Sequence, residues 1–418
     1  MQFQVSGRKV EEQRPQFKFR SYAGTVELEK FAASPIGNLV ETSGTDKRTG
    51  ETYKHSAFVP DPLRSEPQLS NESWRAIGRA NRALGRLQQG SRFVPNPGLL
   101  RQPTLRREAQ STSALEGTFA PLEDVLAADV IDTGSRSLAL AEVLNFVEAA
   151  EVAFGTIEDG QRISLSLLRQ VHAILVRGTA AETIDAGRVR SIQVAIGSRG
   201  GGIEDARFVP MPPGSQLEAG VHDLVDWISA TTSPDERDPV VAAAMAHYQF
   251  ETLHPFNDGN GRIGRLLIVI QLLQDGALAS SLLSVSPWFE QRRERYQDEL
   301  AEVSATSDWD SWVRFFAQGI EAAALDTAKR LERVLDVQDE YQRLLRDAGI
   351  RGIGRDIAAH VIGAPYVDLP TLARALGKTY QGVKDATLKL VALGILDEIT
   401  VRHRKVYRAR AVVEAYSL

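Results

Sequence analysis

The chain has 418 residues, of which 43% are hydrophobic and 25% are charged, and both fractions are typical of globular domains. A net charge of −5 excludes a protein that coats nucleic acid along its whole length, and the absence of cysteine excludes disulfides and thiolate metal sites. The first twenty residues lack the apolar stretch of a secretory signal, and the apolar run at 266–273 is too short to span a bilayer. We therefore expect a cytoplasmic location and no contact with a membrane.

Helical periodicity dominates the chain after its first sixty residues, which predict one hairpin, and a proline-punctuated extended segment at 57–67. The region 189–213 alternates like β-structure around a glycine-rich turn, which predicts a hairpin or flap. The apolar spacing predicts helices over 71–90, 104–117, 121–130, 136–153, 163–176, 214–230, 237–253, 261–275, 287–303 and, as one or two helices, 309–347.

The last segment has a different pattern: helix, short turn at Gly377, helix and then a hairpin over 396–410. This order is the outline of a winged helix. Between residues 351 and 410 there are eleven Lys or Arg against five Asp or Glu. DNA is therefore a candidate partner, as are proteins, because winged helices also serve as docking and dimer-forming modules. The cations that would contact DNA are Lys378, Lys384 and Lys389 on the second helix and Arg402, Arg404 and Lys405 on the wing.

The stretch HPFNDGNGRIGR at 254–265 carries the chemistry that distinguishes this sequence. It lies between two predicted helices, so it is a loop that feeds a helix amino terminus, where free N–H groups favour anions. Gly259 and Gly261 leave the backbone open to a phosphate, and the Asn260 side chain offers a neutral donor. Arg262 and Arg265 are three residues apart, so they share nearly one helix face and can both reach phosphate oxygens.

Three further residues of the stretch have distinct roles. His254, at the opening of the loop, is the candidate general base. Asp258 offers a hard carboxylate oxygen, which suits Mg²⁺ that is shared with substrate phosphates. Phe256 stands between the polar residues and is expected to anchor the loop in the core.

The stretch resembles the signature of the Fic family, HxFx(D/E)GNGRxxR, and every fixed position is filled. The resemblance implies a mainly α fold: a Fic-type helical core with a β-hairpin flap, here followed by the winged helix-turn-helix domain. It also implies transfer of AMP from ATP, with Mg²⁺, to a hydroxyl of a protein target, which can be the chain itself. His254 would then deprotonate the hydroxyl, Asp258 would hold Mg²⁺, and the flap would dock the target. The residues that would hold the phosphates are Gly259, Asn260, Gly261 and Arg262, with Arg265 on the γ-phosphate.

A second motif, TSALEG at 112–117, resembles the inhibitory pattern of the same family, [S/T]xxxE[G/N]. The resemblance implies that Glu116 pairs with Arg265 and prevents productive ATP binding. A carboxylate there would both occupy the partner of the γ-phosphate and repel that phosphate.

From these patterns we expect an amino-terminal Fic-associated region over 1–105, a core over 106–330 with its inhibitory helix near 105–117, and a linker helix with the winged helix over 331–418. Because release of such inhibitory contacts often involves a dimer interface, we expect a homodimer. Two alternatives to a self-inhibited protein adenylyltransferase stay open. One is the same fold with another nucleotide or phosphoryl transfer, or with removal of AMP. The other is a DNA-binding regulator whose core senses nucleotides.

Overall fold

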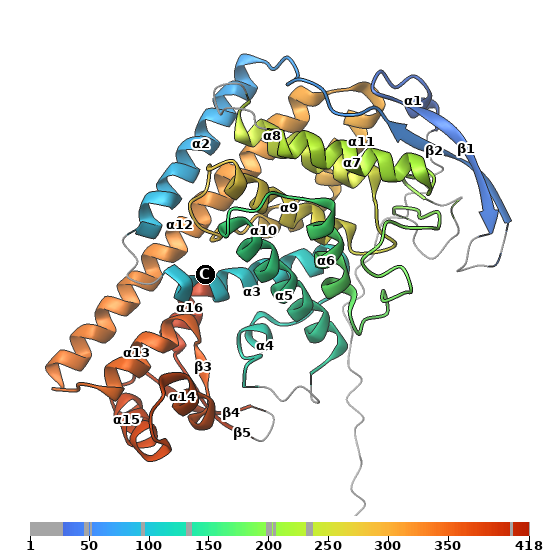
Figure 1. The fold of residues 1–418 in the computed structure, drawn as a ribbon. Helices are drawn as coiled ribbons and strands as arrows, with labels where there is room; N and C mark the ends of the chain where they lie inside the picture. The colour runs from blue at the N-terminus through green and yellow to red at the C-terminus, as the bar shows by residue number, and fades with distance from the viewer. Residues whose placement is uncertain are drawn as a thin grey trace, which may run out of the picture.

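The computed structural model describes residues 28–45, 50, 52–92, 97–130, 136–197, 203, 206–230, 237–401 and 404–417. Within these ranges the protein is mainly helical, with a small two-stranded hairpin near the amino terminus and a small sheet near the carboxyl terminus (Figure 1). Among the described helices, none is both long and apolar enough to cross a membrane.

The amino-terminal part consists of α1 (Leu28–Ala32) and an antiparallel hairpin of β1 (Gly37–Thr45) and β2 (Thr52–Pro60). The hairpin lies within the first sixty residues, as the sequence predicts. The Phe58 N–H of β2 donates to the Val209 carbonyl over 2.9 Å, so the hairpin is also joined to the end of the predicted flap.

Two long helices, α2 (Asn71–Arg92) and α12 (Trp309–Asp347), run side by side along one edge of the molecule (Figure 1). The expected helix over 71–90 continues through Gly90, and the region 309–347 forms one helix rather than two. Ser70 and Asp310 join the starts of the two helices through a 2.7 Å bond from the Ser70 N–H to the carboxylate.

The central helices surround α8 (Pro239–Leu253) and α9 (Asn260–Gln274), which are buried on nearly all sides. Apolar residues lie on every side of both helices, which is typical of a helix buried inside a protein, and the run of alanines in α8 permits close neighbours. Around them lie α3 (Pro97–Leu115), α4 (Leu122–Leu126), α5 (Leu138–Glu158), α6 (Leu165–Val176), α7 (Ser215–Ser229), α10 (Ser286–Glu290) and α11 (Arg293–Thr306).

The sequence prediction was wrong on parts of this group. The expected helix over 121–130 is helical only at Leu122–Leu126, α3 begins at Pro97 rather than at 104, and the expected helix over 287–303 is divided into α10 and α11. The chain leaves helical geometry at Arg292, where φ is −125° and ψ is 29°. The Arg292 guanidinium instead packs over the Trp288 ring at 4.5 Å.

The carboxyl-terminal part contains two helices joined by a tight turn, α14 (Leu369–Leu376) and α15 (Tyr380–Ala392). Gly377 in this turn is left-handed, with φ 62°, and Asp368 and Thr379 cap the two helices, as turn and cap chemistry favour. A small sheet has the strand order β3-β5-β4, with β3 before α14 in the chain and the other two strands after α15. The remaining elements are α13 (Ile353–Gly363), β3 (Tyr366–Val367), β4 (Asp397–Val401), β5 (Arg404–Arg408) and α16 (Arg410–Ser417). Arg402 lies outside the described residues.

Candidate functional site

The loop between α8 and α9 is held in a geometry that most residues avoid. α8 ends at Leu253, and His254 adopts left-handed angles, φ 49° and ψ 61°, which cost a non-glycine residue about 1–3 kcal/mol. Gly259, with φ 78°, is the N-cap of α9, and a Cβ at this position would collide with Leu175. The surrounding contacts must therefore hold both ends of the loop.

Asn260 closes the loop from inside. Its Oδ1 accepts from the Phe256 N–H and its Nδ2 donates to the Phe256 carbonyl, each over 2.8 Å, and the side chain is buried. The amide that the sequence suggests as a phosphate donor is thus already paired. What Asn260 can offer an anion is its backbone N–H in the first turn of α9, where helices leave N–H groups without an acceptor.

Phe256 is fully buried, as expected of a loop anchor, and its ring stacks on His172 with centroids 4.2 Å apart. His172, which the sequence analysis missed, accepts a 2.9 Å bond from the Gly187 N–H. Burial lowers the pKa of His172 to about 4, so it is neutral at pH 7 and serves as an acceptor in the core.

His254 is half-buried, and its Nδ1 lies 3.2 Å from the Glu251 carbonyl. A proton on Nδ1 satisfies that contact and leaves the lone pair on Nε2. Burial lowers the pKa of His254 to about 4, and the nearby Arg190 cation acts in the same direction. The imidazole is therefore neutral at physiological pH, which is the form that a general base requires.

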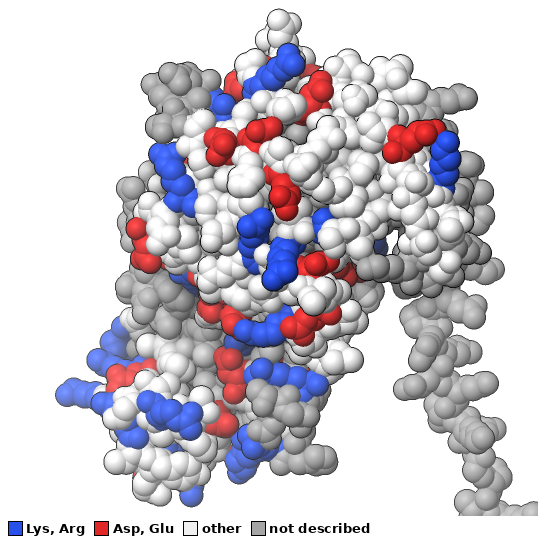
Figure 2. All heavy atoms as spheres, turned by 45° about the vertical axis from the view of Figure 1, so that its right-hand side comes forward, with Lys and Arg blue, Asp and Glu red and all other residues white. Residues whose placement is uncertain are grey.

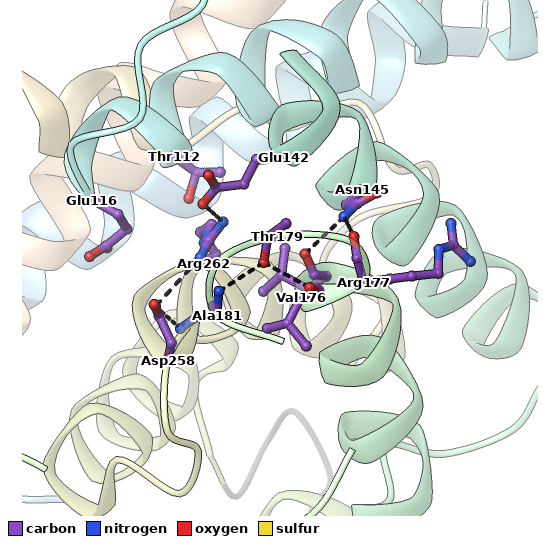
Figure 3. Close-up of polar contacts among 12 residues, drawn as sticks. Thr112, Glu116, Glu142, Asn145, Val176, Arg177, Thr179, Ala181, Asp258 and Arg262 are labelled. Carbon is purple, nitrogen blue, oxygen red and sulfur yellow. Dashed lines mark hydrogen bonds and ion pairs between the residues drawn. The ribbon is translucent and has the colours of Figure 1, made fainter. Parts of the chain in front are cut away.

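Arg262 is buried between two carboxylates, with only 2% of its side chain exposed. Its Nη1 donates to Glu142 of α5 over 2.6 Å, and its Nη2 lies 3.5 Å from Asp258 Oδ1 (Figure 3). Glu142 is a further residue that the sequence analysis missed. The two contacts fix the guanidinium at the start of α9.

Arg265 is equally buried and is enclosed by the end of α3. Its Nε donates to Thr112 Oγ1 over 2.7 Å, and its Nη2 donates to the Thr112 carbonyl over 3.1 Å and to Glu116 Oε1 over 2.6 Å. Burial is the largest single influence and raises the pKa of Glu116, but the charge and hydrogen bond of Arg265, together with the charges of Arg262 and Arg293, lower it overall. Glu116 is therefore ionised and occupies Arg265.

Gly261 makes room for this pair. A Cβ at Gly261 would collide with the Glu116 carboxylate and would lie 3.0 Å from Arg265 Nη1. Gly264, one turn further along α9, makes similar room for the carboxylate of Glu251. Two glycines of the motif thus admit acidic side chains against the helix backbone.

These groups face a cavity of about 130 Å³ that is lined by Glu116, Glu251, His254, Gly261, Arg265 and Tyr296, with Ile196 and Phe208 from the predicted flap. Burial raises the pKa of Glu251 to about 8 despite Arg265, and its Oε1 has no hydrogen-bond partner among the described residues. The buried His247 bridges the Gly264 carbonyl and the Tyr296 hydroxyl, at 2.9 and 2.6 Å, so both of its ring nitrogens have structural partners.

The predicted flap is described only in part. Within the described residues of 192–209, an isolated antiparallel bridge pairs Ile196 with Phe208, and the turn of the expected hairpin lies outside the described residues. The two ends of the predicted flap are joined through Gln193, whose Nε2 donates to the Pro210 carbonyl over 2.8 Å.

Asp258 stands at the mouth of the loop with 57% of its side chain exposed. Among the described residues there is no group of three or more His, Asp or Glu that could hold a metal ion by itself. Asp258 is therefore an exposed carboxylate beside cationic and N–H donors, which fits a cation that arrives with a phosphorylated ligand.

Replacement of Thr112 by valine should destabilise the fold. The change removes the acceptor of the buried Arg265 Nε while keeping the side-chain shape, and an unsatisfied donor of this kind costs about 1–3 kcal/mol. The adjacent Ser113→Ala is the matched control, because the buried Ser113 hydroxyl has no partner among the described residues. Urea denaturation should show a lower midpoint for Thr112→Val than for Ser113→Ala, and equal midpoints would contradict the prediction.

Comparison with known proteins identifies relatives over this region. Residues 74–155 match the family described as "Fic/DOC family N-terminal", and residues 162–272 match "Fic/DOC family". Protein adenylyltransferase fic-1 of Caenorhabditis elegans is 32% identical over 166 residues, which are 40% of this chain and 29% of that protein. Protein adenylyltransferase Fic of Culex quinquefasciatus is 26% identical over 303 residues, or 68% of this chain and 56% of that one.

Among solved structures, a Fic family protein from Desulfovibrio desulfuricans G20 superposes with a TM-score of 0.51 at 22% identity, over 83% of this chain and 98% of that one. At this identity the likeness concerns the fold. The chain spans less than two thirds of the length of these two curated relatives.

Proposed function

Since the chain belongs to the Fic/DOC family, we propose that it is a self-inhibited protein adenylyltransferase, which moves AMP from ATP to a Ser, Thr or Tyr hydroxyl of a protein. The observation that carries the proposal is the convergence on one cavity of the neutral His254, the first turn of α9 and the Arg265–Glu116 pair.

Transfer of this kind depends on positioning and charge neutralisation more than on covalent help. The acceptor hydroxyl gives its proton to His254 Nε2 as its oxygen attacks the α-phosphorus, and the bond from that phosphorus to the bridging oxygen breaks, so that pyrophosphate leaves. The N–H groups of Asn260 and Gly261 with Arg262 hold the α- and β-phosphates, and Arg265 holds the γ-phosphate once Glu116 has left it. Asp258 would hold Mg²⁺, which would neutralise charge on the phosphates.

Glu116 is the inhibitory residue in this proposal. The γ-phosphate and the Glu116 carboxylate compete for the same Arg265 donors, so ATP in a productive pose must displace a charged hydrogen bond of 2.6 Å.

The label that is transferred tests the proposed reaction. The full chain with Glu116→Gly would be incubated with Mg²⁺ and ATP labelled on either the α- or the γ-phosphate, and labelled proteins from the reaction and from an added lysate would be resolved. We expect label from the α-phosphate alone and an added mass of one AMP. Transfer of the γ-label would establish a kinase-like reaction instead. If neither label moves although ATP binds, removal of AMP from a modified protein becomes the better reading.

A second function, binding of duplex DNA, is supported by the carboxyl-terminal part. We propose that α14 and α15 form the helix-turn-helix of a winged helix. The outer side of α15 exposes Tyr380, Gln381, Lys384 and Leu388, which share one helix face. In Figure 2 Lys and Arg side chains are spread over the lower lobe, with a few acids between them. Lys378 lies in the turn before α15 rather than on that helix as predicted, 3.7 Å from Asp356, and Lys405 is paired with Glu398 at 2.7 Å, so these two cations contribute less.

Lys384→Glu should weaken binding of a fluorescein-labelled random duplex, measured by anisotropy at low salt. Loss of a phosphate contact weakens binding to all sequences and lowers the salt slope by about one. Lys329→Glu on α12, outside the helix-turn-helix, is the matched control. Equal affinities of the two variants, or no binding by the unsubstituted chain, would favour a protein-docking module.

A further inference from the structure

Arg190 is a buried cation that the reaction described above does not use. It lies at the start of the predicted flap, and only 2% of the residue is exposed. Burial lowers its pKa to about 10, so it remains charged at neutral pH. A buried charge of this kind is tolerated only when its donors are satisfied.

The donors of Arg190 are satisfied by backbone carbonyls of two separate segments. Nη1 donates to Ile192 over 3.1 Å and Nη2 to Met211 over 2.5 Å, which are the residues on either side of 193–210. Nε donates to His254 over 2.8 Å, and Nη2 also lies 3.4 Å from the Leu253 carbonyl. The backbone N–H of Arg190 adds a 2.9 Å bond to Pro255.

We propose that Arg190 is a positioning residue that fastens both ends of segment 193–210 to the backbone of His254. One planar guanidinium thereby sets the distance between the flap and the imidazole, and it holds the His254 carbonyl while that residue is left-handed. The inference rests on the proposed transfer, in which the flap presents the acceptor hydroxyl. A displacement of about 1 Å between reacting groups can cost about 100-fold in rate.

The charge of Arg190 has a second consequence for His254. The ionisable groups around the imidazole are Arg190 behind it, and Glu116, Arg207, Glu251, Arg265 and Tyr296 around the cavity. Arg190 opposes protonation of His254, whereas Glu116 favours it. Removal of the Arg190 charge should therefore raise the pKa of His254. A substitution that keeps the positive charge but loses the hydrogen bonds of the guanidinium should leave that pKa unchanged.

The test uses the full chain with Glu116→Gly as parent, and Arg190→Lys and Arg190→Met in that background. Arg188→Met, two residues earlier and exposed, is the matched control. The measurements are the initial rate of AMP incorporation into the chain itself from pH 3 to 9, the affinity for ATP by calorimetry, and the melting temperature.

We expect Arg190→Lys to lower the rate about 10- to 100-fold at unchanged ATP affinity and with the acid limb of the pH profile in place. Arg190→Met should lower the rate and also move the acid limb to higher pH, and Arg188→Met should match the parent. If Arg190→Met does not fold, the lysine variant decides. Parental rates in the folded variants, or a loss accounted for by ATP affinity, would overturn the inference. A parent that binds ATP but incorporates no AMP overturns the proposed function, and the inference falls with it.

Discussion

Glu116→Gly should incorporate AMP about 10- to 150-fold faster than the unsubstituted chain at subsaturating ATP. The estimate follows from one charged hydrogen bond, which contributes about 1.5–3 kcal/mol, and from the 1.4 kcal/mol that corresponds to a factor of ten. Without the carboxylate, Arg265 keeps Thr112 as a partner and can accept the γ-phosphate without exchange. The measurement is the initial rate with ATP labelled on the α-phosphate.

A graded series separates charge from reach. Glu116→Gln retains an oxygen that can accept from Arg265 but removes the repulsion of phosphate. Its rate should therefore lie between those of the unsubstituted chain and of Glu116→Gly. Glu123→Gly removes an exposed carboxylate on α4 and should leave the rate unchanged. Calorimetry should show tighter ATP binding in the same order as the rates. If Glu116→Gly folds and binds ATP no better than the unsubstituted chain, Glu116 does not restrain this site.

The local motif could be predicted from the sequence because its parts are consecutive. A loop that ends one helix and begins the next necessarily brings His254, the two glycines and the two arginines together, and the buried position of Phe256 follows from its place among polar residues. The long helices could also be predicted from the sequence, since their apolar spacing is regular.

The supporting contacts could not be predicted in this way. Glu142 lies 120 residues before its partner Arg262, and an acidic residue on an amphipathic helix gives no signal that distinguishes it from a solvated one. Arg190 binds backbone carbonyls, which every residue has, so no partner side chain marks the contact. The available signal is an arginine at the start of a run in which β-branched residues alternate with others.

The Asn260 side chain shows the opposite failure. An amide between two glycines suggests a phosphate donor, but the same amide can close a tight loop, and the backbone of Phe256 takes both of its groups. Local chemistry allowed both uses, and only the fold, which places Phe256 in the core, decides between them.

His254→Ala in the Glu116→Gly background should lower the rate of AMP incorporation by about 10²- to 10⁴-fold, the usual contribution of a general base. ATP affinity should persist, because Arg262, Arg265 and the first turn of α9 remain. His222→Ala, on an exposed position of α7, is the matched control and should retain the parental rate. A double variant as active as its parent would exclude His254 as the base.

The pH profile of the Glu116→Gly parent also tests whether His254 is the general base. Transfer needs neutral imidazole, so the rate should be constant above the pKa of His254 and should fall as the pH drops through it, about 4 in the intact site, where burial and Arg190 disfavour the charged form. Glu116 raises that pKa, so its removal should move the acid limb lower still. An acid limb near pH 6.5, the ordinary value of histidine, would mean that the imidazole is solvated during the reaction, and it would contradict the buried site from which both Glu116 and Arg190 act.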